Sequence, residues 1–499
     1  MNAEDRKLVL WIGDVVPESF VAELRQRGGL DVRTIAERDL SKEAPSARTL
    51  LLEFDGEVGL FVARVRRAQP IALTHGLGIG LVYRQDSQLS AFVRVSEKFD
   101  QDHSEINLQN SSRNETRIIS FIPQDWIATA EWSARYNPGP GANRTIRLKG
   151  TVKDLDEEQR TLLQRSFGFA DEIYLTQLTG GYSDARVFKV RAVGPGVRRR
   201  LAYFAKIDSS KKLVEEIGRY ETFVTELVPF DQRPNLHSRL FAFGNTKAVL
   251  AGDFVDHAIP LADLFGAFKP EGIISNSLLY GALEEWRFNA PLADLPLFQK
   301  FRDLKVLRPA NELKADDRKA RAESIEQAQK HGHCIPEDDL WKIIESLPST
   351  ETRYCTIHGD LHAANILVRV SPLNTFLIDF SKTQEGPAVA DPASLEVSLS
   401  FRFNEQFDVN FLSKLYRYPC SVPDETIHSY ENESLLEIVQ SIRRSGCWNE
   451  KNCFAYVFAL AAYLFGVSSY STYMLEKRAL AYYLSQKLFR DLQDTVREN

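Results

Sequence analysis

The sequence predicts a small α/β domain with a mainly parallel sheet, followed by a larger α+β part. Three observations support this fold class. Buried-strand and helical patterns alternate over residues 1–135, which indicates a parallel sheet covered by helices. From residue 165, apolar and polar residues alternate around Gly-Gly and Gly-Pro-Gly, as in antiparallel hairpins. Helical patterns dominate residues 257–499. A chain of 499 residues exceeds the size of most single cores, so two or three domains are expected.

The elements of the N-terminal part follow in regular alternation. Short apolar runs predict strands, and longer runs with apolar residues at helical spacing predict helices. We expect strands at 7–13 (KLVLWIG), 31–36 (DVRTIA), 49–55 (TLLLEFD) and 70–76 (PIALTHG), and helices at 17–29 (PESFVAELRQRGG) and 57–68 (EVGLFVARVRRA).

Polar residues lie near three of these predicted strand ends. Asp14, Asp55 and Thr74 would meet at the carboxyl edge of the sheet, where such folds carry their function. The arrangement weakly resembles a response-regulator receiver domain, although a second acidic residue after the first strand is missing. The alternative is a small sensing or docking domain that binds a protein partner.

The chain then changes character. The turn-rich stretch YNPGPGANRT (136–145) predicts a domain boundary, and we assign 136–164 to a linker. Residues 165–256 predict a small antiparallel sheet with a helix at 211–229 and a strand at 246–255. Helices are expected to dominate the remainder, 257–499.

Composition excludes several classes of protein. A net charge of −6 argues against a nucleic-acid surface, which needs clustered Lys and Arg. The five cysteines form no CxxC pair, and HGHC (331–334) lacks the second ligand pair of a zinc site. The polar start lacks the apolar segment of a signal peptide, and the most apolar run, 454–467, is too short to span a membrane. We therefore expect a cytoplasmic protein.

One polar cluster stands out, in YCTIHGDLHAANILVRVSPLNTFLIDFSK (354–382). The runs NILVRV and FLIDF flank the turn SPLN and predict a hairpin. Such a hairpin returns Asp379 to the loop that carries Asp360 and Asn365. Two carboxylates and an amide oxygen would then converge, a set of ligands that suits Mg²⁺. Phosphoryl transfer needs little more than a metal, a base and donors around the phosphates.

The same residues carry a family resemblance. HGDLHAANIL followed by LIDFS resembles the catalytic signature of aminoglycoside phosphotransferases and choline-kinase-like enzymes, which are related to protein kinases. The resemblance covers about residues 165–400 and is specific, because several polar residues keep the family spacing. It implies a two-lobed protein-kinase-like domain with a small antiparallel β lobe at 165–256 and a helical C lobe at 257–499. The chain is also similar to a bacterial group of ternary-complex-associated phosphotransferase-like domains.

The resemblance implies roles for residues upstream of the cluster. LTGGYSDARVFKV is similar to the family's phosphate loop, in which Gly180, Gly181 and Ser183 would approach the phosphates. Lys206 in YFAKI would pair with the phosphates, and a helical glutamate would hold it. Both Glu216 and Glu221 border the apolar stripe of that helix; Glu216 is favoured by its place four residues before a tyrosine. LAGDFV (250–255), with Phe254, resembles the segment that cradles the purine.

The resemblance also implies roles within the cluster. Asp360 would take the proton of the acceptor hydroxyl, while Asn365 and Asp379 would bind Mg²⁺. His358 would hold the loop through hydrogen bonds. Asp391, in ADPASLE, matches an Asp-Pro that caps the next helix and steadies the catalytic loop. A histidine at the place of His362 is common in the aminoglycoside-type branch.

The prediction is therefore a Mg²⁺-dependent phosphotransferase that uses ATP or GTP, with a hydroxyl of a small molecule or protein as acceptor. The alternative is a nucleotide-binding signalling module with weak catalysis that acts through its partners. Ser381 replaces the glycine of D-F-G, and Asp184 lies beside a short phosphate loop, both departures from the family pattern. A cationic acceptor would find acidic residues in the region 401–440, namely Glu405, Asp408, Asp424 and Glu431.

Overall fold

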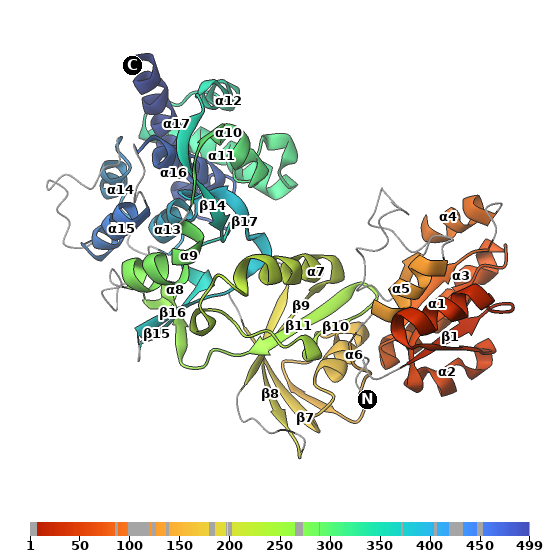
Figure 1. The fold of residues 1–499 in the computed structure, drawn as a ribbon. Helices are drawn as coiled ribbons and strands as arrows, with labels where there is room; N and C mark the ends of the chain where they lie inside the picture. The colour runs from red at the N-terminus through yellow and green to blue at the C-terminus, as the bar shows by residue number, and fades with distance from the viewer. Residues whose placement is uncertain are drawn as a thin grey trace. The chain divides into compact units, whose positions relative to one another are not determined.

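The computed structural model divides the chain into two compact units (Figure 1). Unit 1 comprises Met1–Glu215 and Asn235–Asp256, and unit 2 comprises Glu216–Pro234 and His257–Asn499. The structure describes residues 7–84, 88–97, 119–121, 126–135, 139–178, 185–195, 197, 202–264, 273–288, 290–370, 373–403, 407–418, 433–446 and 453–498.

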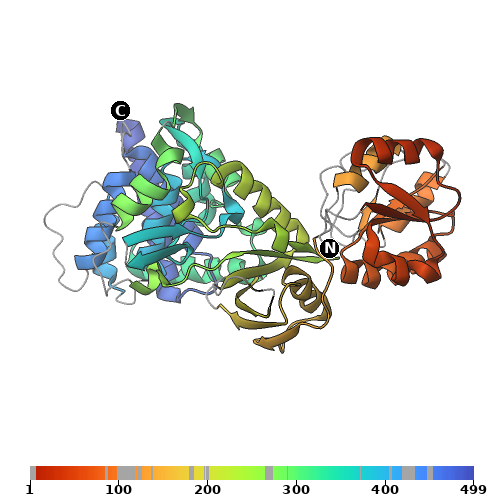
Figure 2. The same cartoon turned by 60° about the horizontal axis from the view of Figure 1, so that its bottom comes forward.

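Unit 1 begins with a five-stranded parallel sheet in the order β2-β1-β3-β4-β5. The sheet lies among helices in the red to orange part of the ribbon (Figures 1 and 2). This order is one of the two common doubly wound arrangements, and it confirms the predicted parallel sheet. The strands are β1 (Leu8–Ile12), β2 (Asp31–Thr34), β3 (Ala47–Glu53), β4 (Gly78–Val82) and β5 (Ile119–Phe121), and the helices are α1 (Glu18–Gly28), α2 (Leu40–Glu43), α3 (Val58–His75), α4 (Leu89–Glu97) and α5 (Trp126–Arg135).

Alternate residues of the central strands bury against opposite helical layers. Val9 and Trp11 of β1 pack with α1 and α5, whereas Leu10 and Ile12 pack in a core with α2, α3 and α4. A strand with both faces covered reads as a continuous apolar run, which is why β1 and β3 could be recognised from the sequence.

One predicted strand is wrong. Residues 70–75 of this range belong to α3, which continues from Val58 to His75 through Pro70, and Gly76 is its C-cap. The buried residues Phe61, Val65, Ala68 and Ala72 keep one helical face on both sides of the proline, so the helix persists, and the strand is the next apolar run, β4. Thr74 therefore lies on a helix and not at a strand end.

The second sheet of unit 1 has the order β10-β11-β9-β8-β7-β6 and is antiparallel except for the parallel pair β6–β7. Its strands are β6 (Arg147–Gly150), β7 (Glu172–Gln177), β8 (Arg186–Val193), β9 (Tyr203–Ser209), β10 (Ala242–Phe243) and β11 (Lys247–Asp253). Within the range predicted as a linker, 136–164, the structure contains β6 and most of α6 (Glu157–Ser166). A capping box between Asp156 and Gln159 begins α6.

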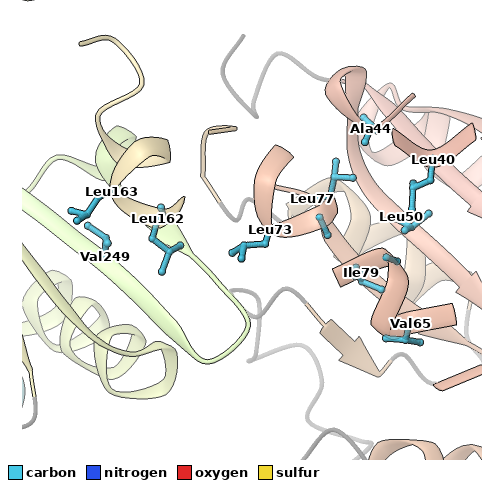
Figure 3. Close-up of a cluster of buried hydrophobic side chains, with 14 of the residues drawn as sticks. Leu40, Ala44, Leu50, Val65, Leu73, Leu77, Ile79, Leu162, Leu163 and Val249 are labelled. Atoms are coloured by element: carbon cyan, nitrogen blue, oxygen red, sulfur yellow. The ribbon is translucent and has the colours of Figure 1, made fainter. Parts of the chain in front are cut away.

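The two sheets of unit 1 share one apolar core. Leu73 and Leu77 belong to the same buried cluster as Leu162 and Leu163 of α6 and Val249 of β11 (Figure 3). The fully buried Arg165 adds polar contacts, because its guanidinium donates to the carbonyl oxygens of Pro140 at 2.7 Å and Phe243 at 2.8 Å. The N-terminal α/β part is therefore packed against the second sheet.

Unit 2 combines helices with two three-stranded sheets, β12-β15-β16 and β13-β14-β17. Its strands are β12 (Ala258–Pro260), β13 (Leu292–Leu295), β14 (Thr350–Ile357), β15 (Ile366–Val370), β16 (Leu373–Leu377) and β17 (Gln384–Pro387). Its α-helices are α8 (Leu261–Leu264), α9 (Glu284–Phe288), α10 (Leu297–Asp303), α11 (Ala315–Ala328), α12 (Glu337–Ser346), α13 (Ala390–Phe401), α14 (Val409–Leu415), α15 (Glu433–Gly446), α16 (Phe454–Val467) and α17 (Leu475–Glu498).

The centre of unit 2 is α16, which is buried on almost all sides and packs against α13 and α17. A helix that is apolar around its whole circumference is expected in such a place. In the described part of the chain, no helix is both long and apolar enough to cross a membrane.

The predicted helix 211–229 is shorter than expected. α7 spans Ser210–Arg219, and a π-helical turn, η6, continues it over Tyr220–Val224. The boundary between the two units falls within α7. A second π-helix, η9, covers Ile273–Ala282 in unit 2. Segments of this type often lie near functional sites.

Candidate active site

The predicted hairpin is present in unit 2 and brings Asn365 and Asp379 to the same end. β15 and β16 pair antiparallel, with Ile366 opposite Leu377. Beyond this pair, the N–H of Ile378 donates to the carbonyl oxygen of Asn365 at 3.0 Å. Asn365 and Asp379 therefore flank one end of the ladder, as the spacing of the sequence indicated.

His358 connects this end of the hairpin to β14. Its side chain is fully buried, and its Nε2 lies 3.0 Å from the carbonyl oxygen of Ile378. A carbonyl oxygen can only accept, so Nε2 carries the proton of this contact. The imidazole also packs on the Phe380 ring, with 5.3 Å between the ring centres. His358 is thus placed to hold the loop.

The buried Asp391 fixes the backbone at the start of the loop. Its carboxylate accepts the N–H of His358 at 2.6 Å and that of Gly359 at 3.0 Å. Burial raises the pKa of the Asp391 carboxyl, although His358 and the two N–H donors oppose this shift. Asp391 lies within α13, whose N-cap is Val389, so its carboxylate steadies the loop and does not cap the helix.

Gly359 is needed at its position for two reasons. Its φ of +75° lies in the left-handed region, and a Cβ there would come 2.3 Å from the carbonyl oxygen of Lys382. The loop and the segment after Asp379 therefore touch backbone to backbone. Asp379 itself has a φ of +64°, which is uncommon for a residue other than glycine.

Asp360 is ion-paired in this structure. Its Oδ2 lies 2.9 Å from Nζ of Lys382, and both side chains are partly exposed. Burial lowers the pKa of Lys382, but its charge interaction and hydrogen bond with Asp360 outweigh burial, so that this pKa is raised. Sequence reasoning missed Lys382; the available signal was a lysine three residues after Asp379.

Two side chains at this end of the hairpin carry oxygen atoms of the kind that Mg²⁺ takes as ligands. Asn365 Nδ2 donates to the carbonyl oxygen of Asp360 at 3.0 Å, which leaves Oδ1 as the acceptor of that side chain. Oδ1 and the Asp379 carboxylate are hard oxygen ligands at neighbouring positions, and Mg²⁺ commonly takes only one or two carboxylates from a protein. Among the described residues, no group of three or more His, Cys, Asp and Glu side chains forms a metal site. The residues of HGHC (331–334) are among those to which this statement applies.

His362 follows Asp360 by two residues in the same loop. Burial lowers the pKa of His362 to about 4, and Arg402, His358 and Lys382 contribute to this shift while Asp360 opposes it. The imidazole is therefore neutral near pH 7. Its ring centre lies 6.5 Å from that of Phe403.

The candidate nucleotide-binding residues that precede the cluster at 354–382 lie in different parts of the structure. Lys206 is buried on β9 of unit 1, opposite Leu250 of β11. Glu216 is buried on α7 in unit 2, whereas Glu221 is exposed, so burial favours Glu216 as the functional glutamate. The three phosphate-loop residues, Gly180, Gly181 and Ser183, lie outside the described residues.

Phe254 directly follows β11 in unit 1. Its N–H donates to the carbonyl oxygen of Ala202 at 3.0 Å, so this donor is already used within unit 1. Its ring lies 4.2 Å from Nζ of Lys189, which in turn pairs with Asp256 at 2.7 Å. The ring and not the N–H of Phe254 is therefore the group that could contact a purine.

Comparisons with known proteins agree with the resemblance stated above. Residues 308–444 match the family described as Ternary complex associated domain 9, which confirms the narrower resemblance for this segment. No curated protein matches the chain.

Several kinases are found among similar solved structures. An ethanolamine kinase from Plasmodium vivax is 13% identical, with a TM-score of 0.32, over 68% of this chain and 85% of that one. A spectinomycin phosphotransferase, solved with ADP and spectinomycin, is 13% identical, with a TM-score of 0.29, over 64% and 88%. A glucosamine kinase is 14% identical, with a TM-score of 0.24, over 67% and 91%. Similarity at this level establishes neither fold nor activity for this chain.

Proposed function

We propose that this chain is a Mg²⁺-dependent phosphotransferase that moves the terminal phosphate of ATP or GTP to a hydroxyl of a small molecule or protein. The observation that carries the proposal is the convergence of Asp360, Asn365 and Asp379 at one end of the β15–β16 hairpin. We further propose that residues 165–499 form a two-lobed protein-kinase-like domain.

In this proposal Asp360 orients the acceptor hydroxyl and accepts its proton. Asn365 Oδ1 and the Asp379 carboxylate hold Mg²⁺, which when bound would neutralise charge on the phosphates. His358 and Asp391 keep the loop rigid, so that the geometry costs little reorganisation during the reaction. Lys382 keeps the Asp360 carboxylate oriented before substrates bind.

The remaining roles in the proposal are the ones that the family resemblance implies. Gly180, Gly181 and Ser183 approach the phosphates, Lys206 pairs with them, Glu216 holds Lys206, and Phe254 contacts the purine. The burial of Lys206 and Glu216 supports a role for both, because buried charges are kept in proteins when they have partners.

A second candidate function is a nucleotide-binding module that signals through a protein partner of its N-terminal α/β part. The Asp360–Lys382 ion pair favours this candidate, because Lys382 occupies the carboxylate that would have to contact the acceptor hydroxyl. Asp360→Ala and Asp379→Ala distinguish the two. A phosphotransferase loses function with either substitution, whereas a binding module loses it only with Asp379→Ala.

The direct test is nucleotide turnover by the full chain with ATP or GTP, with and without Mg²⁺. We expect slow release of nucleoside diphosphate to water that requires Mg²⁺ and is abolished by Asp360→Ala, while nucleotide binding by this variant is retained. Turnover that persists in Asp360→Ala would contradict the role of Asp360. Nucleotide binding without any turnover in the wild type would favour the second candidate.

A further inference from the structure

Exposed apolar side chains gather at one edge of the N-terminal parallel sheet. Among the described residues of 7–135, four large apolar side chains are exposed, namely Val15 (81%), Leu60 (59%), Leu89 (36%) and Ile127 (45%). Val15 lies just after β1, and the other three lie in the first turns of α3, α4 and α5, which follow β3, β4 and β5. Since all five strands are parallel, these positions share the carboxyl edge of the sheet. We call these four residues the carboxyl-edge surface.

Hydrogen bonds join three of the segments that carry this surface. The guanidinium of Arg84, which follows β4, donates to the carbonyl oxygen of Val15 at 2.5 Å. Gln88, which directly precedes Leu89, donates to the carbonyl oxygen of Phe54 at 3.5 Å, just after β3. The segments that follow β1, β3 and β4 are therefore in contact.

The start of α5 lies beside β1. The ring of Trp126 is 6.1 Å from that of Trp11, measured between ring centres. Trp11 in turn donates through Nε1 to the carbonyl oxygen of Asp14 at 3.0 Å. The segment that carries Ile127 is therefore close to the one that carries Val15.

The centre of this edge is filled by charge pairs. Glu53, at the end of β3 and only 6% exposed, accepts the N–H of Asp14 at 2.8 Å and pairs with the guanidinium of Arg84. Asp55 pairs with Arg64 at 2.9 Å. Sheets of this kind commonly bind small ligands in the crevice at these strand ends, but here the charged groups are paired with one another. What the edge offers to a partner is its outer surface.

Three carboxylates make this outer surface negative. Asp14, Glu18 and Glu57 are exposed, and none of the three has an ion pair within the described part of the chain. Glu18 lies in the first turn of α1, and Glu57 is the N-cap residue of α3. A helix N-terminus carries only about half a positive charge, so each of these carboxylates exceeds the charge of its helix end. The two arginines of this edge are neutralised by their own carboxylates.

A second acidic region, expected from the sequence at 401–440, shows no comparable surface. Asp408 caps α14 by accepting the N–H groups of Asn410 at 2.8 Å and Phe411 at 3.1 Å. The other three acids of that expectation, Glu405, Asp424 and Glu431, lie outside the described residues.

We propose that the carboxyl-edge surface docks a basic amphipathic helix of a partner protein. Apolar side chains that gather on a surface mark interaction sites, whereas singly scattered ones do not. Aliphatic side chains beside carboxylates complement a helix with one apolar face and one face rich in lysine or arginine. Addition of a β-strand requires the side of a strand, and this edge presents strand ends. The same carboxylates oppose contact with an anionic membrane. The inference does not depend on the proposed phosphotransferase function.

Synthetic helical peptides of about 18 residues, or five turns, test the proposal. The first carries leucine on one face and lysine on the other. The second has glutamate in place of each lysine, and the third has serine in place of each leucine. Binding of each labelled peptide to the full chain, without nucleotide, is measured by fluorescence anisotropy at low and at physiological ionic strength. We expect the leucine–lysine peptide to bind about tenfold more tightly than the other two, and more weakly as salt is added.

Variants assign this binding to the carboxyl-edge surface. Leu60→Ser combined with Leu89→Ser removes two apolar contacts and should weaken binding of the leucine–lysine peptide by about tenfold. Glu57→Lys reverses an exposed charge and should weaken it by about fivefold, with a smaller dependence on salt. The controls are Val496→Ser, on α17, and Asp31→Lys, at the amino end of β2 in the same sheet. Both controls change exposed residues and should bind the peptide as the wild type does.

Several outcomes would overturn the proposal. Equal binding of the lysine and glutamate peptides, or binding of neither, would contradict the charge complementarity. Wild-type binding in both edge variants would place the peptide elsewhere on the chain. Cosedimentation of the full chain with vesicles of phosphatidylcholine and phosphatidylglycerol, or its self-association in sedimentation velocity, would assign the surface to a membrane or to a second copy if Leu60→Ser with Leu89→Ser abolished it. Because nucleotide is absent, failure of the phosphotransferase proposal would leave these results unaffected.

Discussion

Nζ of Lys382 lies 2.9 Å from Oδ2 of Asp360, so the proposed proton acceptor has a cationic partner within the protein itself. The pair is partly exposed, and such pairs stabilise a fold by only about 0–1 kcal/mol. Its significance is therefore its position beside the reacting groups.

Lys382→Met separates a catalytic from a structural role. We expect the free energy of unfolding to change by no more than about 1 kcal/mol. Turnover should fall by about 10²-fold, as when a positioned donor is removed from a charged reaction centre. The control is Lys342→Met, which removes an exposed pair with Asp339 at 2.7 Å. Equal turnover in both variants would contradict the role of Lys382.

Asp391→Ala tests the anchoring of the loop. The substitution leaves the buried N–H of His358 and that of Gly359 without their acceptor, at about 1–3 kcal/mol for a buried donor. We expect a loss of about 2–5 kcal/mol in urea unfolding, together with loss of turnover. Asp408→Ala, which removes only the cap of α14, should cost about 1 kcal/mol and serves as the comparison. Equal losses would contradict the anchoring role.

His362 should make the fold sensitive to acid. Its pKa of about 4 lies below the 6.5 of an exposed histidine, so the unfolded chain binds a proton first as the pH falls. The contribution of His362 to the free energy of unfolding is therefore complete above pH 6.5 and is lost as the pH falls from 6.5 to 4. At pH 5 this loss amounts to about 2 kcal/mol.

His362→Gln should remove this part of the pH dependence. The difference in unfolding free energy between pH 8 and pH 5 should be smaller than in the wild type by about 2 kcal/mol. The control is His333→Gln, a change of an exposed histidine. A variant with the wild-type pH dependence would show that His362 is not buried in its neutral form.

A buried ion pair in unit 2 gives a further test. Oε1 of Glu396 lies 2.7 Å from Nη2 of Arg443, and both side chains are almost fully buried. The hydroxyl of Tyr456 donates to the same carboxylate at 2.7 Å. Arg443→Met leaves Glu396 buried without its cation and should cost about 3–5 kcal/mol in urea unfolding. A loss below about 1 kcal/mol would contradict the burial of this pair.

Much of the fold and the hairpin could be predicted from the sequence. The buried strands of the N-terminal sheet are continuous apolar runs, and the turn between β15 and β16 is flanked by β-rich segments, so both signals are local. The proximity of Asn365 and Asp379 followed from the hairpin alone. The strand predicted at residues 70–76 was wrong because a short apolar run does not distinguish a strand from a helix.

Other features depend on contacts between distant segments. The Asp391 carboxylate reaches back over about thirty residues to the His358 N–H, a contact that spacing alone does not give. The pairing of Lys382 with Asp360 arises from the backbone contact at Gly359. Arg165, whose guanidinium donates to the distant carbonyl oxygens of Pro140 and Phe243, reads in the sequence as an ordinary surface residue.

The most direct measurement for the proposed function is a thermal-shift titration of the full chain with ATP and GTP, with and without Mg²⁺, repeated on Asp379→Asn. Asparagine is the best replacement, because it tolerates the φ of +64° and keeps the side-chain shape. At about 100 times the dissociation constant, the nucleotide should stabilise the wild type by about 2.7 kcal/mol in the presence of Mg²⁺. We expect this shift to be lost in Asp379→Asn. No shift in the wild type with either nucleotide would contradict a nucleotide site at Asp379.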